Sequence, residues 1–387
     1  MRDTFLPFAR PVLSEAAISE VVDCLKSGWI TSGPKLKKFE QMLADYTQAP
    51  HALALSSATA GLQLALMALD IGAEDEIITT PMTFACTLNV IEIVGARVRL
   101  VDVNRHTYNI DADAIEAAIS EKTRAIMPVH FAGAPVDLDK IYALAQKYGL
   151  AVIEDAAHAI GAEYKGKKIG SFGDLQVFSF HPNKNITTGE GGCVITRDDA
   201  IAKKISLIRF HGMDREAWNR FGKSGSPHYQ IVYPGYKYNM MDMQAALGIH
   251  QLPMLDGFIE ARTRLVNRYK EKLKDFDYLI LPQAPDYVHK HAWHLFAPTI
   301  NTAKTNLTRD EVIEKLKALN IGTGIHFEAA HLYPYYAEKY GFKKGDFPQA
   351  EDIGAKIFSL PLFPTMSESE QDDVIEALYQ VFANKSY

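Results

Sequence analysis

Short apolar runs alternate with helical patterns between residues 51 and 198. Seven of these runs are predicted to be strands, at 51–57, 76–81, 98–103, 125–131, 151–157, 176–181 and 193–197. Several are continuously apolar, without the alternation of polar residues that marks a strand with one face in water. Between two of them, Leu62, Leu66 and Leu69 repeat with helical spacing. The alternation predicts a doubly wound α/β fold, in which helices cover both faces of a mainly parallel seven-stranded sheet.

The pattern changes near residue 255. A helical run at 255–273 is followed by a strand-like run at 293–300. Two S/T-x-x-E capping boxes, at 308–311 and 367–370, each precede a segment with helical apolar spacing. Because 387 residues exceed one ordinary core, we expect a large domain of residues 1–254, which includes the N-terminal segment, and a smaller C-terminal α+β domain of residues 255–387.

Charge and cysteine content narrow the class of protein. The chain has 41 basic and 47 acidic residues, evenly mixed, and no basic run of the kind that binds nucleic acid, so a small-molecule substrate is favoured. Cys24, Cys86 and Cys193 have neither disulfide nor metal-site spacing, so no metal is expected. With no leader-like start and no long apolar stretch, the sequence predicts a cytoplasmic protein without a membrane span.

One lysine lies where chemistry is expected. Lys184 lies between two predicted strands, just ahead of the acidic, glycine-rich turn at 189–192. Asp155 ends an apolar strand, where an unpaired carboxylate would be costly to bury, so we expect a cationic partner for it. In pyridoxal phosphate (PLP) enzymes a lysine holds the cofactor as a Schiff base and an aspartate pairs with the pyridinium nitrogen. The two residues therefore predict PLP, against the alternatives of a surface lysine and a structural salt bridge.

Further residues extend this hypothesis. The segment 56–61, Ser-Ser-Ala-Thr-Ala-Gly, follows the first strand and opens a helix, where it forms either a phosphate site or an ordinary N-cap. Ser179, at the end of another strand, is placed to reach the same phosphate. Phe84 follows the second strand and either covers the cofactor ring or joins the core. His158 either contacts the ring or is structural.

Motifs along nearly the whole chain resemble those of one family. They are Ser-Gly-Trp-Ile-Thr-Ser-Gly-Pro at 27–34, the segment 56–61, Glu-Asp-Ala-Ala-His at 154–158, Ser-Phe-His with Lys184 and Glu-Gly-Gly at 179–192, Pro-Gly-Tyr-Lys-Tyr-Asn at 234–239 and Gly-Thr-Gly-Ile-His-Phe at 322–327. In order and spacing the chain is similar to the sugar aminotransferases of the DegT/DnrJ/EryC1/StrS family, which are fold-type I PLP enzymes.

The resemblance implies roles for individual residues. Lys184 forms the Schiff base and Asp155 holds the pyridinium nitrogen. The other implied cofactor contacts are Thr59, Ala60 and Ser179 at the phosphate, Phe84 and His158 at the ring, and Lys237 or Asn239 from a neighbouring subunit. The implied substrate contacts are Thr31, His181 and His326. Because the loop at 235–239 enters the neighbouring subunit's site in this family, a homodimer is implied.

The resemblance also implies a reaction. L-Glutamate gives its amino group to a 4-keto nucleotide sugar and leaves as 2-oxoglutarate. The forms of the motifs at 179–184 and 235–239 are most similar to the branch that acts in lipid A modification, which favours a UDP-4-keto-pentose. The alternative is a UDP-4-keto-6-deoxy-N-acetylhexosamine, as in pseudaminic acid synthesis. PLP-dependent sugar dehydratases have histidine in place of the lysine, so Lys184 argues against them. A non-catalytic PLP-binding sensor is the remaining alternative.

Overall fold

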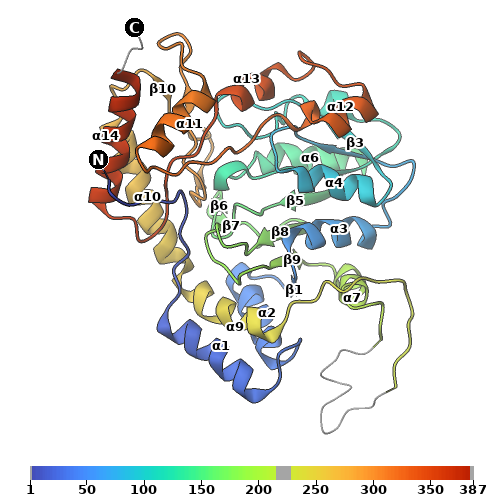
Figure 1. Cartoon of the computed structure of the whole chain (residues 1–387). Coiled ribbons are helices and arrows are strands. Elements are labelled where there is room, and N and C mark those ends of the chain that lie inside the picture. Colours follow the sequence, from blue (N-terminus) through green and yellow to red (C-terminus); the bar gives the residue numbers. More distant parts are fainter. Residues whose placement is uncertain (1, 215–227, 384–387) are drawn as a thin grey trace.

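The computed structural model describes residues 2–214 and 228–383. A seven-stranded sheet lies at the centre, with strand order β1-β9-β8-β5-β4-β2-β3 (Figure 1). Its strands are β1 His51–Leu55, β2 Glu76–Thr79, β3 Arg97–Leu100, β4 Thr123–Ile126, β5 Ala151–Asp155, β8 Leu175–Ser179 and β9 Gly192–Thr196. Only β9 runs antiparallel to its neighbours, β1 and β8. The predicted mainly parallel sheet of seven strands is confirmed, and each strand ends one to five residues earlier than expected.

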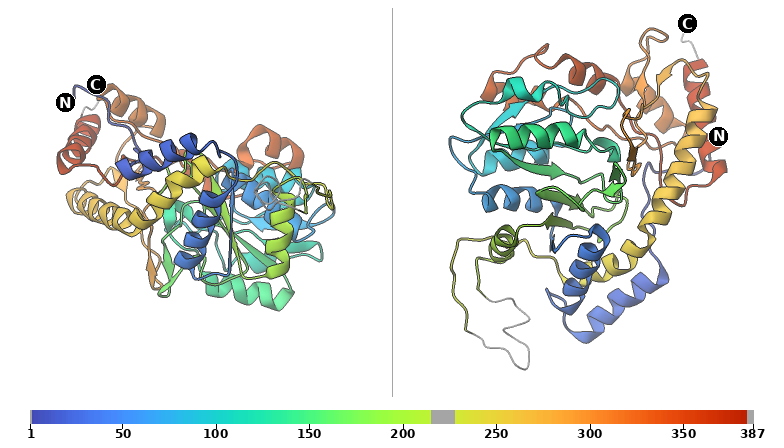
Figure 2. Two further views of the ribbon diagram at one scale, coloured as in Figure 1. Left: turned by 90° about the horizontal axis from the view of Figure 1, so that it is seen from below. Right: turned by 180° about the vertical axis from the view of Figure 1, so that it is seen from behind.

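Helices cover both faces of the sheet, as the views from below and from behind show (Figure 2). The helices of this part of the chain are α1 Glu15–Ser27, α2 Pro34–Thr47, α3 Ala58–Ala68, α4 Ala85–Ile93, α5 Ile115–Ala118, α6 Leu138–Tyr148, α7 Asp199–Ile208 and α9 Asp242–Gln251. Side chains of α2, α6 and α9 pack on one face, and those of α3, α4 and α7 pack on the other. The predicted doubly wound architecture follows from this arrangement.

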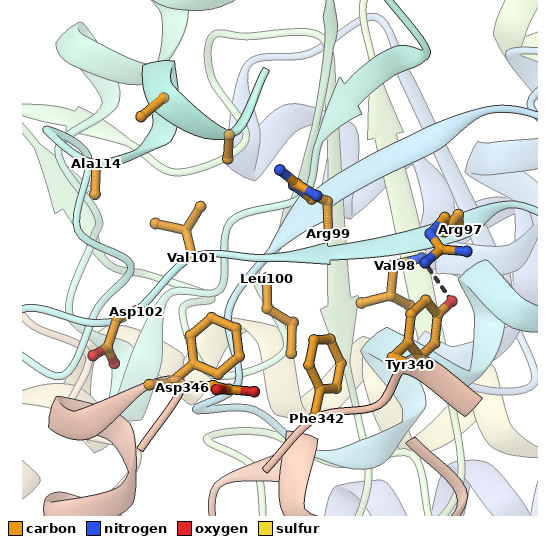
Figure 3. Close-up of a pocket in the computed structure, with 13 residues that line it drawn as sticks. Arg97, Val98, Arg99, Leu100, Val101, Asp102, Ala114, Tyr340, Phe342 and Asp346 are labelled. Carbon is orange, nitrogen blue, oxygen red and sulfur yellow. Dashed lines mark hydrogen bonds between the residues drawn. The ribbon is translucent and has the colours of Figure 1, made fainter. Parts of the chain in front are cut away.

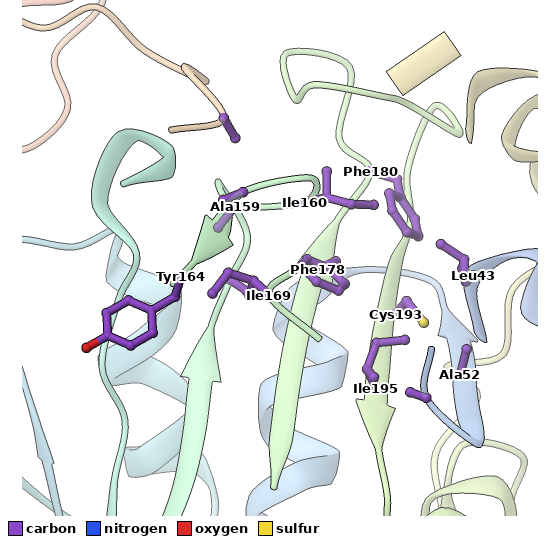
Figure 4. Packing of buried hydrophobic residues seen from close by; sticks show 14 of the residues in the cluster. Leu43, Ala52, Ala159, Ile160, Tyr164, Ile169, Phe178, Phe180, Cys193 and Ile195 are labelled. Carbon is purple, nitrogen blue, oxygen red and sulfur yellow. The ribbon is translucent and has the colours of Figure 1, made fainter. Parts of the chain in front are cut away.

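The two cores are separated by the sheet itself. Successive side chains of a strand point to opposite faces, so Ile78 and Val152 join one core while Ile77 and Ile153 join the other. Figure 4 shows part of the first core, where Phe178 of β8 packs with buried neighbours from β9. Because neither face of the central strands meets water, their sequences are continuously apolar.

The C-terminal part forms a core of its own. Its elements are α10 Leu255–Lys272, β10 Leu279–Ile280, β12 Thr299–Ile300, α11 Arg309–Ala318, α12 Pro334–Tyr340, α13 Pro348–Lys356 and α14 Glu368–Ala383. A cluster of buried side chains joins α10, α11 and α14. Both predicted capping boxes are present, since the hydroxyls of Thr308 and Ser367 accept hydrogen bonds from the amides of Glu311 and Glu370.

The N-terminus also packs against this C-terminal part. Leu6 belongs to the same buried cluster, and its amide donates to the carbonyl of Asn320 at 2.8 Å. Arg2 forms an ion pair of 2.7 Å with Asp373, which brings the two ends of the chain together (Figure 1). The division into domains of residues 1–254 and 255–387 stays a prediction.

The strand expected at 293–300 is mostly wrong. Only its last two residues, in β12, are a strand. Upstream, the amides of Ala292 and Leu295 donate to the carbonyls of Gly133 and Ala132, in the short 3₁₀ helix η1 Phe131–Gly133. The backbone groups that a strand would use are therefore committed to a loop contact, which the side-chain pattern alone does not reveal.

A small separate sheet is formed by β6 Glu163–Tyr164, β7 Lys167–Lys168 and β11 His289–Lys290. Two further 3₁₀ helices are η2 Leu252–Met254 and η3 Ala330–Leu332.

Candidate active site

A cavity of about 380 Å³ opens at the carboxyl edge of the parallel strands. This edge is the usual ligand-binding place in open α/β sheets, because the loops that follow several strands meet there. Asp155 is the last residue of β5, Ser179 is the last of β8, and Phe84 lies in the loop after β2. The cavity lining includes eight of the predicted site residues: Thr59, Phe84, Asp155, His158, Ser179, His181, Lys184 and His326.

Lys184 lies in the loop between β8 and β9, where its amide donates to the carbonyl of His181 at 2.9 Å. Burial lowers the pKa of its side-chain amine to about 8, although the charges of Asp155 and Cys86 oppose the shift. Since the charged form is disfavoured out of water, a substantial fraction of the amine is neutral near physiological pH. A neutral amine is the form that acts as a nucleophile and as a proton acceptor.

Asp155 is only 4% exposed. Its Oδ2 accepts a hydrogen bond of 2.7 Å from Thr87 Oγ1, and its Oδ1 accepts one of 3.2 Å from the amide of Ala157. Burial raises the pKa of the carboxyl group, and these two donors, together with the charge of Lys184, oppose the rise. The carboxylate thus lines the cavity at a place where a cationic group would be favoured.

The N-terminus of α3 forms the polar end of the cavity. Ser57 caps this helix, and its Oγ accepts the amide of Ala60 at 3.1 Å. Thr59 and Ser57 line the cavity, and the amides of the first helical turn have no partner within a helix. Gly192 allows the approach, because a Cβ at this position would lie 2.4 Å from the backbone of Ser57. Amides, hydroxyls and helix dipole together suit an anion.

Aromatic side chains form the walls. Phe84 is 62% exposed at the head of α4, and its ring centroid lies 6.1 Å from that of Phe327. His158 stacks on Phe327 at 5.9 Å, and burial lowers the pKa of its imidazole well below the ordinary value, so the ring is neutral. His326 accepts or donates a hydrogen bond of 2.9 Å between Nδ1 and Ser359 Oγ, and burial lowers its pKa to about 4.

Four predicted site residues do not line this cavity in their own chain: Thr31, Ala60, Lys237 and Asn239. The amide of Ala60 is used by the cap of Ser57. The carbonyl of Thr31 accepts the amide of Asp242 at 3.3 Å, beside the loop that carries Asn239. Asn239 donates to Ser32 Oγ and accepts from Lys237 Nζ, both at 2.5 Å. Thr31, Lys237 and Asn239 thus form a second group beside the edge strand β1, where Asn239 pairs with Leu55.

Sequence reasoning missed Thr87, which contacts Asp155 directly. Cys86 also lines the cavity, and burial and the charge of Asp155 raise the pKa of its thiol to about 12. Both residues lie in the first turn of α4, three and two residues after Phe84. The only sequence signal for Thr87 is a hydroxyl residue that follows the second predicted strand by a few positions. It is weak, because buried threonines are common at helix starts.

Another cavity of about 440 Å³ lies at the outer edge of the sheet, along β3 (Figure 3). Arg97 and Arg99 project from this edge, and Tyr340 closes it from α12, its hydroxyl accepting the amide of Val98 at 2.9 Å. Since the carboxylate, lysine and anion site lie at the other cavity, the chemistry is assigned there.

In the described residues no three His, Cys, Asp or Glu side chains are grouped to hold a metal ion. Across residues 2–214 and 228–383, no helix combines the length and apolar character needed to cross a bilayer.

Residues 11–379 match the model of the DegT/DnrJ/EryC1/StrS aminotransferase family. The chain belongs to this family. It is 45% identical over 384 residues to the spore coat polysaccharide biosynthesis protein SpsC of Bacillus subtilis, which covers 98% of both chains. A putative sugar aminotransferase of Streptococcus pneumoniae, Spr1654 in its PMP form, has a TM-score of 0.89 at 32% identity and covers 98% of this chain and 99% of its own. Helicobacter pylori PseC, an aminotransferase involved in the biosynthesis of pseudoaminic acid, has a TM-score of 0.90 at 28% identity and covers 98% and 100%.

The family assignment makes the protein a PLP-dependent sugar aminotransferase with the fold-type I architecture. The pneumococcal relative has been solved in both PLP and PMP forms. The residues present fit this cofactor, because the cavity combines a buried carboxylate, a lysine whose amine is partly neutral and a helix N-terminus suited to a phosphate. Lys184 would hold the cofactor covalently, Asp155 would face its ring nitrogen, and Ser57, Thr59 and Ser179 would bind its phosphate.

Proposed function

We propose that this chain transfers an amino group from L-glutamate to the keto group at C-4 of a nucleotide sugar, giving a 4-amino sugar and 2-oxoglutarate. The observation that carries the proposal is the joint placement of Lys184 and Asp155 in one cavity beside the N-terminus of α3. Family membership supports the amino transfer and the sugar. The C-4 position, the nucleotide and the donor rest on the resemblance to one branch of the family.

Bound PLP supplies an electron sink for the carbanion that forms when a proton leaves the amino-acid α-carbon. The chain supplies the base. With a pKa of about 8, the amine of Lys184 takes a proton at Nζ from the α-carbon of the donor and delivers a proton to C-4 of the sugar. The same atom serves both halves of the reaction, so ping-pong kinetics are expected.

Other residues of the cavity hold and orient the cofactor and the substrate. Asp155, which is buried, would keep a proton on the ring nitrogen of bound PLP by offering it a negative charge. Ser179, 6% exposed at the end of β8, and the first turn of α3 bind the phosphate and so fix the distance from Lys184. Phe84 covers one side of the cavity, and His181 and His326 line its open part, where the sugar enters.

Two sugars fit the proposal. The motif forms favour a UDP-4-keto-pentose, whereas the relatives favour a UDP-4-keto-6-deoxy-N-acetylhexosamine, because H. pylori PseC acts in pseudoaminic acid biosynthesis and matches this chain over 98% of its length. SpsC is named for spore coat polysaccharide biosynthesis, which is consistent with a sugar substrate and does not distinguish the two. We therefore place the hexosamine first when the two are tested.

We further propose that the active unit is a homodimer in which Lys237 or Asn239 reaches the partner's cavity. The segment just before them carries exposed apolar side chains, with Ile231 57% and Val232 54% exposed. The same segment extends away from the body of the molecule (Figure 1). Apolar side chains on a projecting segment are typical of an interface.

The decisive experiment records the visible spectrum of the purified holoprotein. L-Glutamate should bleach the visible absorption band that colours the holoprotein yellow, and the preferred keto sugar should restore it. Restoration by the hexosamine alone, by the pentose alone or by both names the substrate, and 2-oxoglutarate release confirms the donor. Lys184→Ala should abolish both changes, whereas Lys317→Ala, on the exposed face of α11, should leave them intact. A band that glutamate does not change in the wild type would favour a non-catalytic sensor.

A further inference from the structure

A line of buried hydroxyl groups runs behind Asp155. Thr87 Oγ1 lies 2.7 Å from Asp155 Oδ2, and Thr83 Oγ1 lies 2.7 Å from Thr87 Oγ1. The side chain of Thr87 is fully buried and that of Thr83 is 1% exposed. Thr83 belongs to the loop after β2 and Thr87 to the first turn of α4, while Asp155 ends β5. The line therefore connects the start of α4 to the end of β5.

The direction of the donors in this line is fixed. An ionised carboxylate only accepts hydrogen bonds, so Thr87 must donate its single hydroxyl hydrogen to Asp155. The contact between the two threonines then requires Thr83 to donate to Thr87. The hydrogen bond from Thr87 is stronger when it goes to an ionised carboxylate than when it goes to a neutral acid. The line therefore favours the charged form of Asp155.

The line also surrounds Phe84. Thr83 precedes this residue directly, and Thr87 follows it by three positions. Hydrogen bonds on both sides tie the turn that carries the Phe84 ring to the carboxylate at the end of β5. Two walls of the cavity, one aromatic and one anionic, therefore keep a fixed spacing.

We propose that Thr87 is a positioning residue for Asp155, which it holds charged and aimed at the ring nitrogen of bound PLP, and that Thr83 orients Thr87. The inference rests on the role proposed above for Asp155. The hydroxyl of Thr87 keeps Asp155 charged, because a hydrogen bond to the charged form of a carboxyl group favours that form. Three other groups act on the same carboxyl: Lys184, from the loop after β8, and His130, from the loop after β4, favour the charged form, while Cys86 of α4 lies beside it.

The test compares Thr87→Val, which keeps the shape of the side chain, with Thr87→Ser, which keeps the hydroxyl. The dissociation constant of PLP is measured at pH 6, 7.5 and 9 by absorbance and by fluorescence quenching. Thr87→Val should weaken binding about tenfold, the value of one hydrogen bond to a charged group. The loss should be larger at pH 6 than at pH 9, because the carboxyl protonates more readily without its donor. Thr87→Ser should stay within about twofold of wild type.

A double variant separates positioning from simple structural support. If Thr87 acts through Asp155, Thr87→Val should change PLP affinity by less than about twofold in an Asp155→Asn background. An equal loss in both backgrounds and at every pH would overturn the inference. Thr83→Val, expected to shift affinity in the same direction by a smaller factor, serves if Thr87→Val does not fold. Should Asp155→Asn itself bind PLP like the wild type at all three pH values, the role of Asp155 fails instead.

Discussion

The ring of His130 donates from Nε2 to Oε2 of Glu154, 2.8 Å away, on the opposite side of β5 from the candidate site. The tautomer follows from the other ring nitrogen, because Nδ1 accepts the amide of Val136 at 3.1 Å. Glu154 also accepts hydrogen bonds from Tyr142 and Gln176, each at 2.7 Å. The buried carboxylate of Glu154, which directly precedes Asp155 in the sequence, thus accepts hydrogen bonds from three side chains.

Replacing Glu154 should therefore destabilise the fold. In Glu154→Gln, the new amide group must face at least one of three donors, which leaves a buried donor without an acceptor. The free energy of unfolding should fall by about 1–3 kcal/mol. Urea denaturation of the apoprotein measures it. Glu338→Gln, on the exposed surface of α12, is the matched control and should change stability by less than about 0.5 kcal/mol. Equal stability of the two variants would show that the network contributes little.

The amine of Lys184 should titrate far below an ordinary lysine. Burial lowers its pKa to about 8, so its neutral fraction grows as the pH rises from about 7 to 9. Trace acylation of the apoprotein between pH 6 and 11, read by mass spectrometry, gives a profile for each lysine. Lys122 is the internal comparison, because its hydrogen bond to Glu74 raises its pKa. Coincident midpoints for the two lysines would contradict this expectation.

Sequence predicts this fold well where burial is complete. The central strands are recognisable because both of their faces meet helices. Asp155 and Ser179 end their strands, and α3 begins after β1, as the sequence pattern predicts. The strand expected at 293–300 is mostly wrong, since the amide of Leu295 bonds to Ala132, in a loop more than 150 residues away. Local side-chain pattern does not record such a partner.

The site is predictable only in part for a similar reason. Thr87 is one of several buried threonines. Its role depends on the hydrogen bond to Asp155, at the end of β5, and not on its neighbours in the sequence. Thr31, Lys237 and Asn239 match family motifs yet lie outside the cavity of their own chain. A motif identifies such residues without giving the subunit in which they act, which depends on assembly.

His326 should affect the sugar half of the reaction more than the glutamate half. It lines the open part of the cavity beside Ile325, and its Nδ1 is held by Ser359 Oγ, which leaves Nε2 for the substrate. His326→Phe should raise KM for the keto sugar about tenfold, the cost of one lost hydrogen bond, with KM for L-glutamate within about twofold. With a pKa of about 4 the ring is neutral at pH 6–8, so the effect should not vary over that range. Equal changes in both KM values would place His326 elsewhere in the reaction.

The shared site can be tested by mixing two inactive proteins. Lys184→Ala lacks the base, and a Lys237→Gln, Asn239→Ser double variant lacks the residues proposed to act in the partner. If the sites are shared, a heterodimer contains one intact site, formed by Lys184 of the double variant and the loop of the Lys184→Ala subunit. After unfolding and refolding together in equal amounts, half of the dimers are mixed, so about a quarter of wild-type activity should return. Separately refolded proteins, combined only afterwards, are the control. If both residues act within their own chain, the mixture stays as inactive as its components, because the subunit that retains Lys184 then lacks the loop residues that its own site needs.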